Sequence, residues 1–119
     1  MKIRITVNGE TLTARLAVNA TARHFMSLLP LTLVMEDFAG KEKIANPPEE
    51  LVTNGAPEGS VGNAGDLMLY APWGNLAFFY QDHGYARGLI PIAELEDAHA
   101  FRPGSEPVNV RYELIPACA

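Results

Sequence analysis

Apolar and polar residues alternate most clearly over residues 2–16 of this 119-residue chain. The two halves of this stretch are separated by Asn8-Gly9, and in each half apolar residues occupy every second position. A period of two places successive side chains on opposite faces of a strand. Asn-Gly suits a type I′ turn, because both residues tolerate a positive φ. We therefore expect a β-hairpin with one buried face and one face in water.

A helical spacing of apolar residues follows the hairpin. Asn19 or Thr21 suits the N-cap, and Pro30 ends the helix at about Leu29. Because so short a helix is marginal by itself, we expect its apolar face, through Phe25 and Leu29, to close one end of the core. The apolar residues that recur at this spacing are Ala22, Phe25, Met26 and Leu29.

The rest of the chain contains short apolar runs separated by turn residues. Residues 72–75, Pro-Trp-Gly-Asn, separate two of these runs and predict a second hairpin. Pro91 interrupts another run, which places that strand at a sheet edge or at a β-bulge. The predicted strands cover residues 31–38, 44–45, 67–71, 76–80, 89–92 and 108–114.

Three stretches are expected to lie outside strands. Residues 46–65 are rich in Pro, Gly, Asn and Ser, which predicts a long irregular loop that is either functional or mobile. Residues 82–88 are also expected to form a loop. Residues 94–100 favour one helical turn, and their acidic side chains are expected to face water.

The spacing of strands and turns is typical of an all-β barrel or sandwich. We predict a mainly β fold: a closed β-barrel of about eight strands with one short capping helix. The length fits one domain spanning residues 1–119. Neither half of the chain alone would have enough strands to enclose a core.

Composition and charge exclude several classes of function. The formal net charge is −5, and an acidic surface repels a phosphate backbone, so we expect no nucleic-acid partner. No apolar run approaches the ~20 residues that a membrane helix needs, and the alternating N-terminus does not resemble a signal peptide. The single Cys118 fits a reducing compartment. We therefore expect a cytoplasmic protein with no membrane contact.

Short segments spread along the chain carry a family resemblance. The most specific covers residues 70–75, Tyr-Ala-Pro-Trp-Gly-Asn. Together with the opening hairpin, these segments resemble the small bacterial proteins of the cyclophilin-like fold group, over the chain from Met1 to about Glu96. The resemblance implies a cyclophilin-like β-barrel. One departure is Ile92-Ala93, where the family usually has Leu-Gly. The further segments are residues 18–23, 29–33, 40–45, 65–67, 79–80 and 88–90.

True cyclophilins rotate X–Pro peptide bonds, and the resemblance raises this activity as an alternative. Rotation must overcome a barrier of ~18–20 kcal/mol that comes from amide conjugation. The family's isomerases use an arginine beside an apolar proline pocket, with glutamine, tryptophan and histidine around it. Residues 77–80, Ala-Phe-Phe-Tyr, weakly resemble their core strand. The chain lacks their Phe-His-Arg and Phe-Met-Gln segments, so we expect no isomerisation of a standard proline peptide.

Aromatic residues and one histidine are the remaining candidates for a site. Trp73 lies in a turn, where a large aromatic side chain is often exposed and used for contact with a ligand or a second subunit. His83 follows Asp82, which could orient an imidazole for acid–base chemistry. The three histidines show no metal-ligand spacing. The proposed groove residues are Phe38, Tyr70, Trp73, Phe79, Tyr80 and His83.

These candidates predict a non-catalytic module that binds a small molecule or peptide in an aromatic groove, without cofactor or metal. A five-residue strand spans about 17 Å, which separates Trp73 from Tyr80 and His83 at opposite ends of the hairpin. We therefore expect Tyr80 and His83 to form the closer pair. Trp73 is the better candidate for a homodimer contact.

Overall fold

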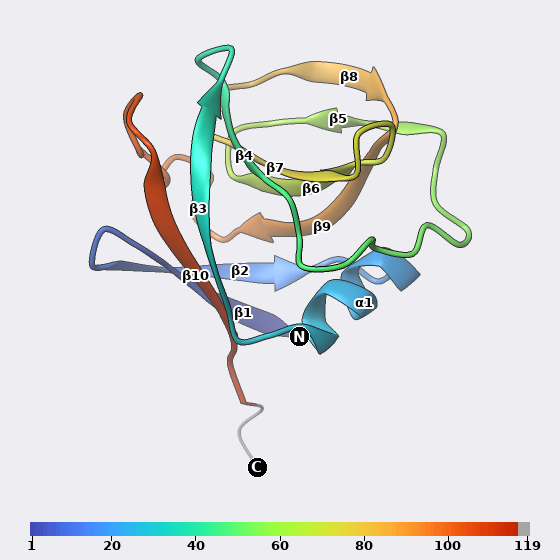
Figure 1. The fold of residues 1–119 in the computed structure, drawn as a ribbon, viewed down its shortest axis with the longest axis horizontal. Coiled ribbons are helices and arrows are strands. Elements are labelled where there is room, and N and C mark those ends of the chain that lie inside the picture. Colours follow the sequence, from blue (N-terminus) through green and yellow to red (C-terminus); the bar gives the residue numbers. More distant parts are fainter. Residues whose placement is uncertain (117–119) are drawn as a thin grey trace.

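In the computed structural model, which describes residues 1–116, the chain forms strands and one short helix, α1 (Figure 1). Cys118 lies outside the described residues. Within residues 1–116, no helix is long and apolar enough to cross a membrane. In chain order the elements are β1 (Lys2–Val7), β2 (Glu10–Leu16), α1 (Ala20–Ser27), β3 (Leu31–Phe38), β4 (Glu42–Ala45), β5 (Gly59–Gly62), β6 (Asp66–Tyr70), β7 (Asn75–Phe79), β8 (Gly84–Arg87), β9 (Leu89–Leu95) and β10 (Val108–Leu114).

Eight of the strands close into a barrel, in the order β1-β10-β3-β4-β7-β6-β9-β2. Every neighbouring pair is antiparallel. A closed barrel has no exposed sheet edge, which removes the main aggregation hazard of β proteins. The predicted all-β barrel of about eight strands with one short helix is confirmed.

The first hairpin forms as its sequence predicts. Asn8 has φ of 50° and Gly9 has φ of 82°, the two positive values that a type I′ turn requires. The turn sets the register in which Ile5 faces Leu12 across β1 and β2. Ile3 and Ile5 therefore both point into the barrel and are fully buried.

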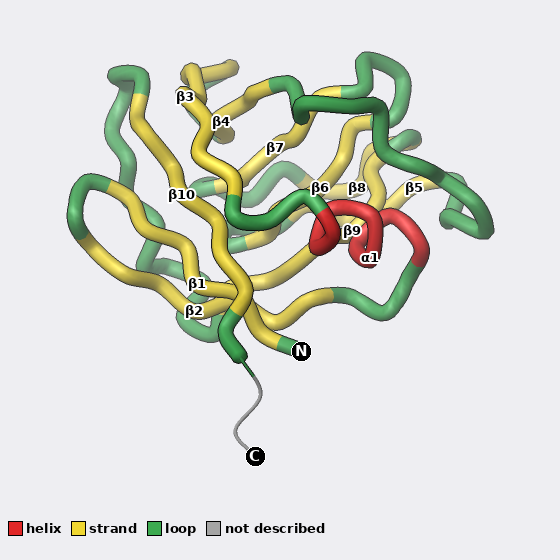
Figure 2. Tube along the Cα trace, turned by 60° about the horizontal axis from the view of Figure 1, so that its bottom comes forward, coloured by secondary structure: helices red, strands yellow, loops and turns green. Residues whose placement is uncertain are grey.

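Helix α1 covers one end of the barrel (Figure 2). Asn19 is its N-cap, and the side-chain oxygen of Asn19 accepts a hydrogen bond of 2.7 Å from the backbone N–H of Ala22. Phe25 is fully buried and meets the ring of Tyr112 edge-on, with 5.4 Å between ring centroids. Leu29 is only partly buried at the margin of the same core.

Phe101 closes the other end of the barrel, beside the β1–β2 turn. Its ring stacks on that of Phe78, with ring centroids 3.8 Å apart. The segment that carries Phe101 follows β9, and β9 continues as a strand as far as Leu95. Residues 94–100 were expected to include a helical turn, and this prediction is wrong. Glu94 instead pairs with Arg15 of β2, because extending β9 is what closes the barrel at that junction.

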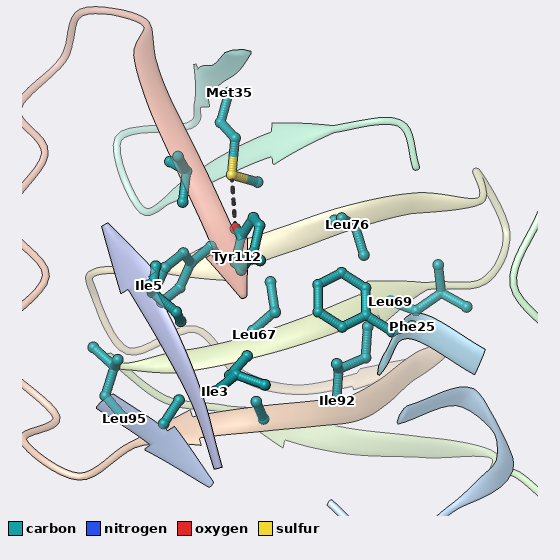
Figure 3. Packing of buried hydrophobic residues seen from close by; sticks show 14 of the residues in the cluster. Ile3, Ile5, Phe25, Met35, Leu67, Leu69, Leu76, Ile92, Leu95 and Tyr112 are labelled. Atoms are coloured by element: carbon teal, nitrogen blue, oxygen red, sulfur yellow. Dashed lines mark hydrogen bonds between the residues drawn. The ribbon is translucent and has the colours of Figure 1, made fainter. Parts of the chain in front are cut away.

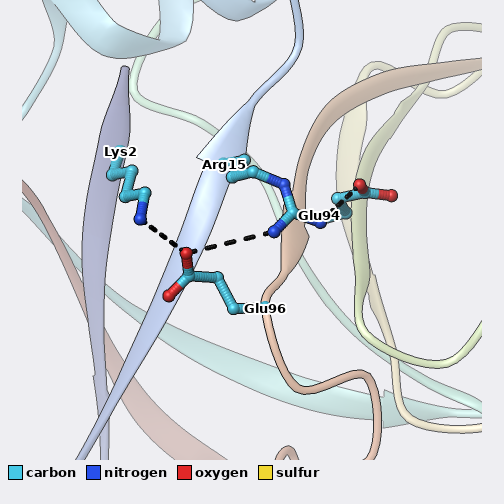
Figure 4. Close-up of polar contacts among 4 residues, drawn as sticks. All are labelled: Lys2, Arg15, Glu94 and Glu96. Carbon is cyan, nitrogen blue, oxygen red and sulfur yellow. Dashed lines mark hydrogen bonds and ion pairs between the residues drawn. The ribbon is translucent and has the colours of Figure 1, made fainter.

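Three ion pairs lie on the outside of the barrel at the β2–β9 junction (Figure 4), and the longest joins Arg15 to Glu96 at 3.9 Å. Arg15 reaches Glu94 at 2.8 Å, and Lys2 reaches Glu96 at 2.6 Å. All four side chains are well exposed, so water and salt screen these pairs and each contributes little to stability. The junction is held mainly by its backbone ladder and by the core behind it.

Apolar side chains from all eight barrel strands and α1 fill the barrel interior (Figure 3). Tyr112 is the largest fully buried residue there, and its hydroxyl donates a hydrogen bond of 3.0 Å to the sulfur of Met35. Burial raises the pKa of Tyr112. This bond gives a buried hydroxyl an acceptor that an apolar core would otherwise lack.

A second apolar cluster lies on the outside of the barrel wall. Along β7 the side chains alternate, so that Phe78 belongs to the interior core and Phe79 to the outer cluster. The whole of β7 is therefore buried on both faces. The buried residues of the outer cluster are Met68, Ala77, Phe79 and Leu89.

A two-stranded ribbon, β5 paired with β8, covers part of this outer cluster (Figure 1). A Cβ at Gly62 of β5 would lie 3.0 Å from the Phe79 ring, so glycine permits the close approach. Residues 46–65 and 82–88 were expected to be loops, and the structure corrects part of each expectation. Gly59–Gly62 and Gly84–Arg87 form strands, whereas residues 46–58 lie outside strands and helices as predicted. Their glycine-rich strands carry too few apolar residues for the alternation to show.

Pro91 lies at a β-bulge, which is one of the two positions that the sequence predicted for it. The register between β6 and β9 shifts there, because Leu67 faces Ala93 whereas Met68 faces Pro91. The skipped residue, Ile92, points into the core and accepts a backbone hydrogen bond of 2.8 Å from Ala17. Ala93 has no positive φ, so the absence of glycine at that position causes no strain.

Lys43 is a fully buried charge on the inner face of β4, opposite Phe78. Its ammonium donates to the carbonyl of Glu106 at 2.7 Å and lies 3.3 Å from the carboxylate of Asp37. The hydroxyl of Tyr80 also donates to Asp37. This hydrogen bond, together with Lys43, holds the pKa of Asp37 below its usual value, whereas burial and Asp37 raise the pKa of Tyr80 to about 12.

We predict that Phe25→Ala lowers the free energy of unfolding by about 3–5 kcal/mol, because it leaves a cavity at a closed end of the barrel. Denaturant titration measures the loss. Arg23→Ala, at an exposed position of the same helix, is the matched control and should change stability little. Equal stability of the Phe25→Ala variant and the control would contradict the capping role of α1.

The buried Lys43 predicts an unequal response of its two partners to substitution. Asp37→Asn keeps an acceptor for Tyr80 but leaves a buried ammonium without an opposite charge, so it should destabilise the fold clearly. Lys43→Met removes the buried charge and leaves Asp37 partly exposed and bonded to Tyr80. It should therefore cost less than Asp37→Asn in thermal unfolding. The reverse order would show that the ion pair does not determine stability here.

Candidate functional site

A pocket of about 250 Å³ lies on the outer face of the barrel wall, between β4, β7 and β8. We call it the aromatic pocket. Its walls come from the β3–β4 hairpin, the β6–β7 hairpin and the segment from His83 to Leu89. Several of its apolar side chains meet solvent, among them Phe38 and Trp73. The lining residues are Phe38, Glu42, Ile44, Tyr70, Trp73, Asn75, Phe79, His83, Ala86 and Leu89.

Trp73 forms one wall of the aromatic pocket from the turn between β6 and β7. Gly74, with φ of 70°, bends the chain there, and its N–H donates to the carbonyl of Tyr70 at 2.8 Å. The Trp73 ring then lies edge-on to Phe38 and to Tyr70, with centroid distances of 5.8 and 5.5 Å. The indole remains 64% exposed. A large apolar surface is thus held in place while most of it still faces water.

Phe79 and His83 form the opposite wall. Their ring centroids are 5.5 Å apart. The backbone N–H of His83 donates to the carbonyl of Gly62 at 2.8 Å, which ties this loop to β5. The His83 side chain is exposed. An imidazole is therefore available at the rim of the aromatic pocket.

Two polar side chains, Glu42 and Asn75, lie in the wall between these aromatic groups. Glu42 is only 9% exposed, and burial raises the pKa of its carboxyl, an effect that the nearby His83 opposes. Asn75 is 6% exposed, and its amide N–H donates to the Leu76 carbonyl at 3.0 Å. Its side-chain oxygen is buried without a hydrogen-bond donor among the described residues.

The structure brings five of the six proposed groove residues to this one pocket. They are Phe38, Tyr70, Trp73, Phe79 and His83. Trp73 and His83, expected at opposite ends, share the aromatic pocket because the indole leans back against Phe38 over the outer face of the wall. Whether these residues bind a ligand stays a prediction.

Tyr80 does not line the aromatic pocket. It follows Phe79 directly, and its ring lies edge-on to Phe101 with 6.2 Å between centroids. The structure therefore separates Tyr80 from His83, which we expected to be the closer pair. Asp82 also does not orient His83, because its carboxylate accepts a hydrogen bond of 2.9 Å from the backbone of Ala64.

Sequence reasoning missed five of the lining residues: Glu42, Ile44, Asn75, Ala86 and Leu89. Glu42 and Asn75 are the polar ones among them. Both were assigned to turns, since Glu42 follows Gly40 and Asn75 follows Gly74. In the structure each is the first residue of a strand, β4 and β7 respectively. Had β4 been predicted to begin at Glu42, the period of two would have placed Glu42 beside Ile44 on one face. No group of three potential metal ligands occurs within residues 1–116.

Comparison with known proteins agrees with this architecture. The family model described as the cyclophilin-like family matches residues 5–113. No curated protein sequence matches the chain significantly. The family match spans the barrel strands from β1 to β10 and both hairpins that form the aromatic pocket. The chain therefore belongs to the cyclophilin-like family.

Proposed function

We propose that this protein is a cytoplasmic, non-catalytic module that binds a small molecule, or one side chain of a peptide, in the aromatic pocket. The observation that carries the proposal is the exposed apolar surface of Trp73 held against Phe38 and Tyr70 beside an open cavity. Ligand pockets are typically such concave apolar sites with a few polar groups. The single cysteine of the sequence supports a reducing, cytoplasmic setting.

Prolyl isomerisation is the alternative that the family raises. An isomerase of this family needs an arginine beside the proline pocket. No arginine is among the described residues that line the aromatic pocket, and its charged residue is Glu42. Arg15 and Arg87 are engaged elsewhere, with Glu94 and Glu58 respectively. A carboxylate cannot donate a hydrogen bond to the prolyl nitrogen when ionised, and this favours the binding module.

We predict that fragments with an aromatic ring shift the backbone NMR signals of Trp73, Phe79 and His83. Trp73→Ala should lower the affinity for the tightest-binding fragment by about tenfold or more, because it removes the largest ring of the pocket wall. Tyr85→Ala is the matched control, since Tyr85 is an exposed aromatic residue of β8 outside the pocket lining. It should leave the affinity unchanged.

An isomerase assay with a standard proline peptide completes the test. We expect no acceleration over the uncatalysed rate. Robust turnover would overturn the non-catalytic proposal. Fragment shifts that avoid the aromatic pocket, or equal affinity of the Trp73→Ala and Tyr85→Ala variants, would show that the pocket is not the binding site.

A further inference from the structure

Glu42 is the acidic residue that lines the aromatic pocket. Its side chain is 9% exposed, and burial raises the pKa of its carboxyl. The described residues give it neither a hydrogen bond nor an ion pair. Its carboxylate oxygens are not closed to solvent, so water in the pocket reaches them. Holding a carboxylate largely buried against aromatic walls without a cation costs free energy, which a cationic ligand would offset.

The chemistry of Glu42 selects the ligand group. Asn75 also lines the pocket, but its side-chain oxygen is closed to solvent, and it lies at the other end of β7 from Phe79, the residue opposite Glu42. An ionised carboxylate is an acceptor without a donor. A ligand that pairs with Glu42 must bring donors and no negative charge. An ammonium group has three N–H donors and no acceptor.

The walls of the aromatic pocket suit the same group. Phe38, Tyr70, Trp73 and Phe79 supply aromatic rings, and a cation near a ring face is attracted by the ring quadrupole. No lysine or arginine lines the pocket, so within the described residues His83 is the only basic side chain that could compete for Glu42.

The size of the pocket limits the ligand. A volume of about 250 Å³ corresponds to about eight waters at ~30 Å³ each. That space holds one benzylamine-sized group, and a larger ligand would extend into solvent past Trp73, which is 64% exposed.

We infer that the aromatic pocket binds the ammonium group of an apolar amine, with Glu42 as its anionic partner. This inference rests on the proposed binding function and specifies its ligand class. According to this inference, Glu42 lowers the stability of the free protein and raises its affinity for the amine. The two effects can be measured separately.

The first measurement compares three ligands of similar shape and different charge on the unmodified protein at pH 8. Benzylamine carries a proton there, benzyl alcohol is neutral and benzoate is an anion. The chain has a single tryptophan, so its indole N–H gives one NMR signal that reports on the pocket. We expect benzylamine to bind about tenfold tighter than benzyl alcohol, and benzoate to bind weakest.

The second measurement uses Glu42→Gln, which removes the charge and keeps the shape. This variant should lose the preference for benzylamine over benzyl alcohol. Because burial raises the pKa of Glu42, its ionisation opposes folding above its unfolded pKa, so Glu42→Gln should also raise the melting temperature at pH 8. Glu36→Gln is the control: Glu36 is exposed on the neighbouring strand β3 and does not line the pocket. It should change neither property.

Each outcome separates this inference from the proposed function. Equal binding of benzylamine and benzyl alcohol, or a preference that survives Glu42→Gln, would overturn the amine inference while leaving the pocket a binding site. A lower melting temperature for Glu42→Gln would give Glu42 a structural role and also overturn it. If none of the three ligands shifts the tryptophan indole signal at millimolar concentration, and aromatic fragments do not either, the proposed binding function itself fails.

Discussion

The burial of β7 on both of its faces is the constraint on which the rest of the structure depends. In a closed barrel the inner face of each strand belongs to the core, and the outer face usually meets water. Here Phe78 packs inside against Phe101, and its neighbour Phe79 packs outside in the second cluster. The wall of this barrel therefore needs apolar cover from outside as well as from within.

The ribbon of β5 and β8 supplies only part of that cover. Gly62 lets it approach Phe79 closely, and Ala86 packs on the same cluster. The ribbon leaves the aromatic pocket open beside it, from Glu42 opposite Phe79 at one end of β7 to Trp73 before Asn75 at the other. The aromatic pocket is the uncovered remainder of an apolar surface, and this explains why Phe38 and Trp73 remain exposed beside it.

Two adjacent charged residues of β4, Glu42 and Lys43, differ in the partners that the fold gives them. Lys43, inside the barrel, has Asp37 and the Glu106 carbonyl as partners. Glu42, its neighbour on the outer face, has none among the described residues. Neighbouring residues thus carry a charge paired within the protein and a charge whose oxygens only solvent reaches. The contrast suggests different uses: Lys43 belongs to the folded scaffold, and Glu42 to a ligand site.

Much of this fold could be predicted from local patterns. The hairpin at Asn8-Gly9, the helix capped by Asn19 and the bulge at Pro91 each follow from turn chemistry or periodicity within a few residues. The strands β5 and β8 could not be predicted in this way, because Gly59–Gly62 and Gly84–Arg87 have little apolar alternation. They form because the outer face of β7 offers a surface to pack against, which is a tertiary effect.

The aromatic residues of the candidate site could be predicted from the sequence, whereas its polar residues Glu42 and Asn75 could not. Large rings are visible in a sequence as candidates for contact, and five of those proposed line one pocket. The exclusion of Tyr80 follows from the alternation of side chains along the chain, because the predicted strand 76–80 already places Phe79 and Tyr80 on opposite faces. Glu42 and Asn75 were hidden because each follows a glycine turn, where polar residues need no special explanation.

The central claim is that the aromatic pocket pairs an apolar ammonium with Glu42. A crystal structure of the protein with benzylamine tests it most directly. The account predicts the ammonium nitrogen within hydrogen-bond distance of the Glu42 carboxylate and the benzyl ring among Phe38, Trp73 and Phe79. An ammonium that lies in solvent, or a ligand seated outside the aromatic pocket, would contradict the account.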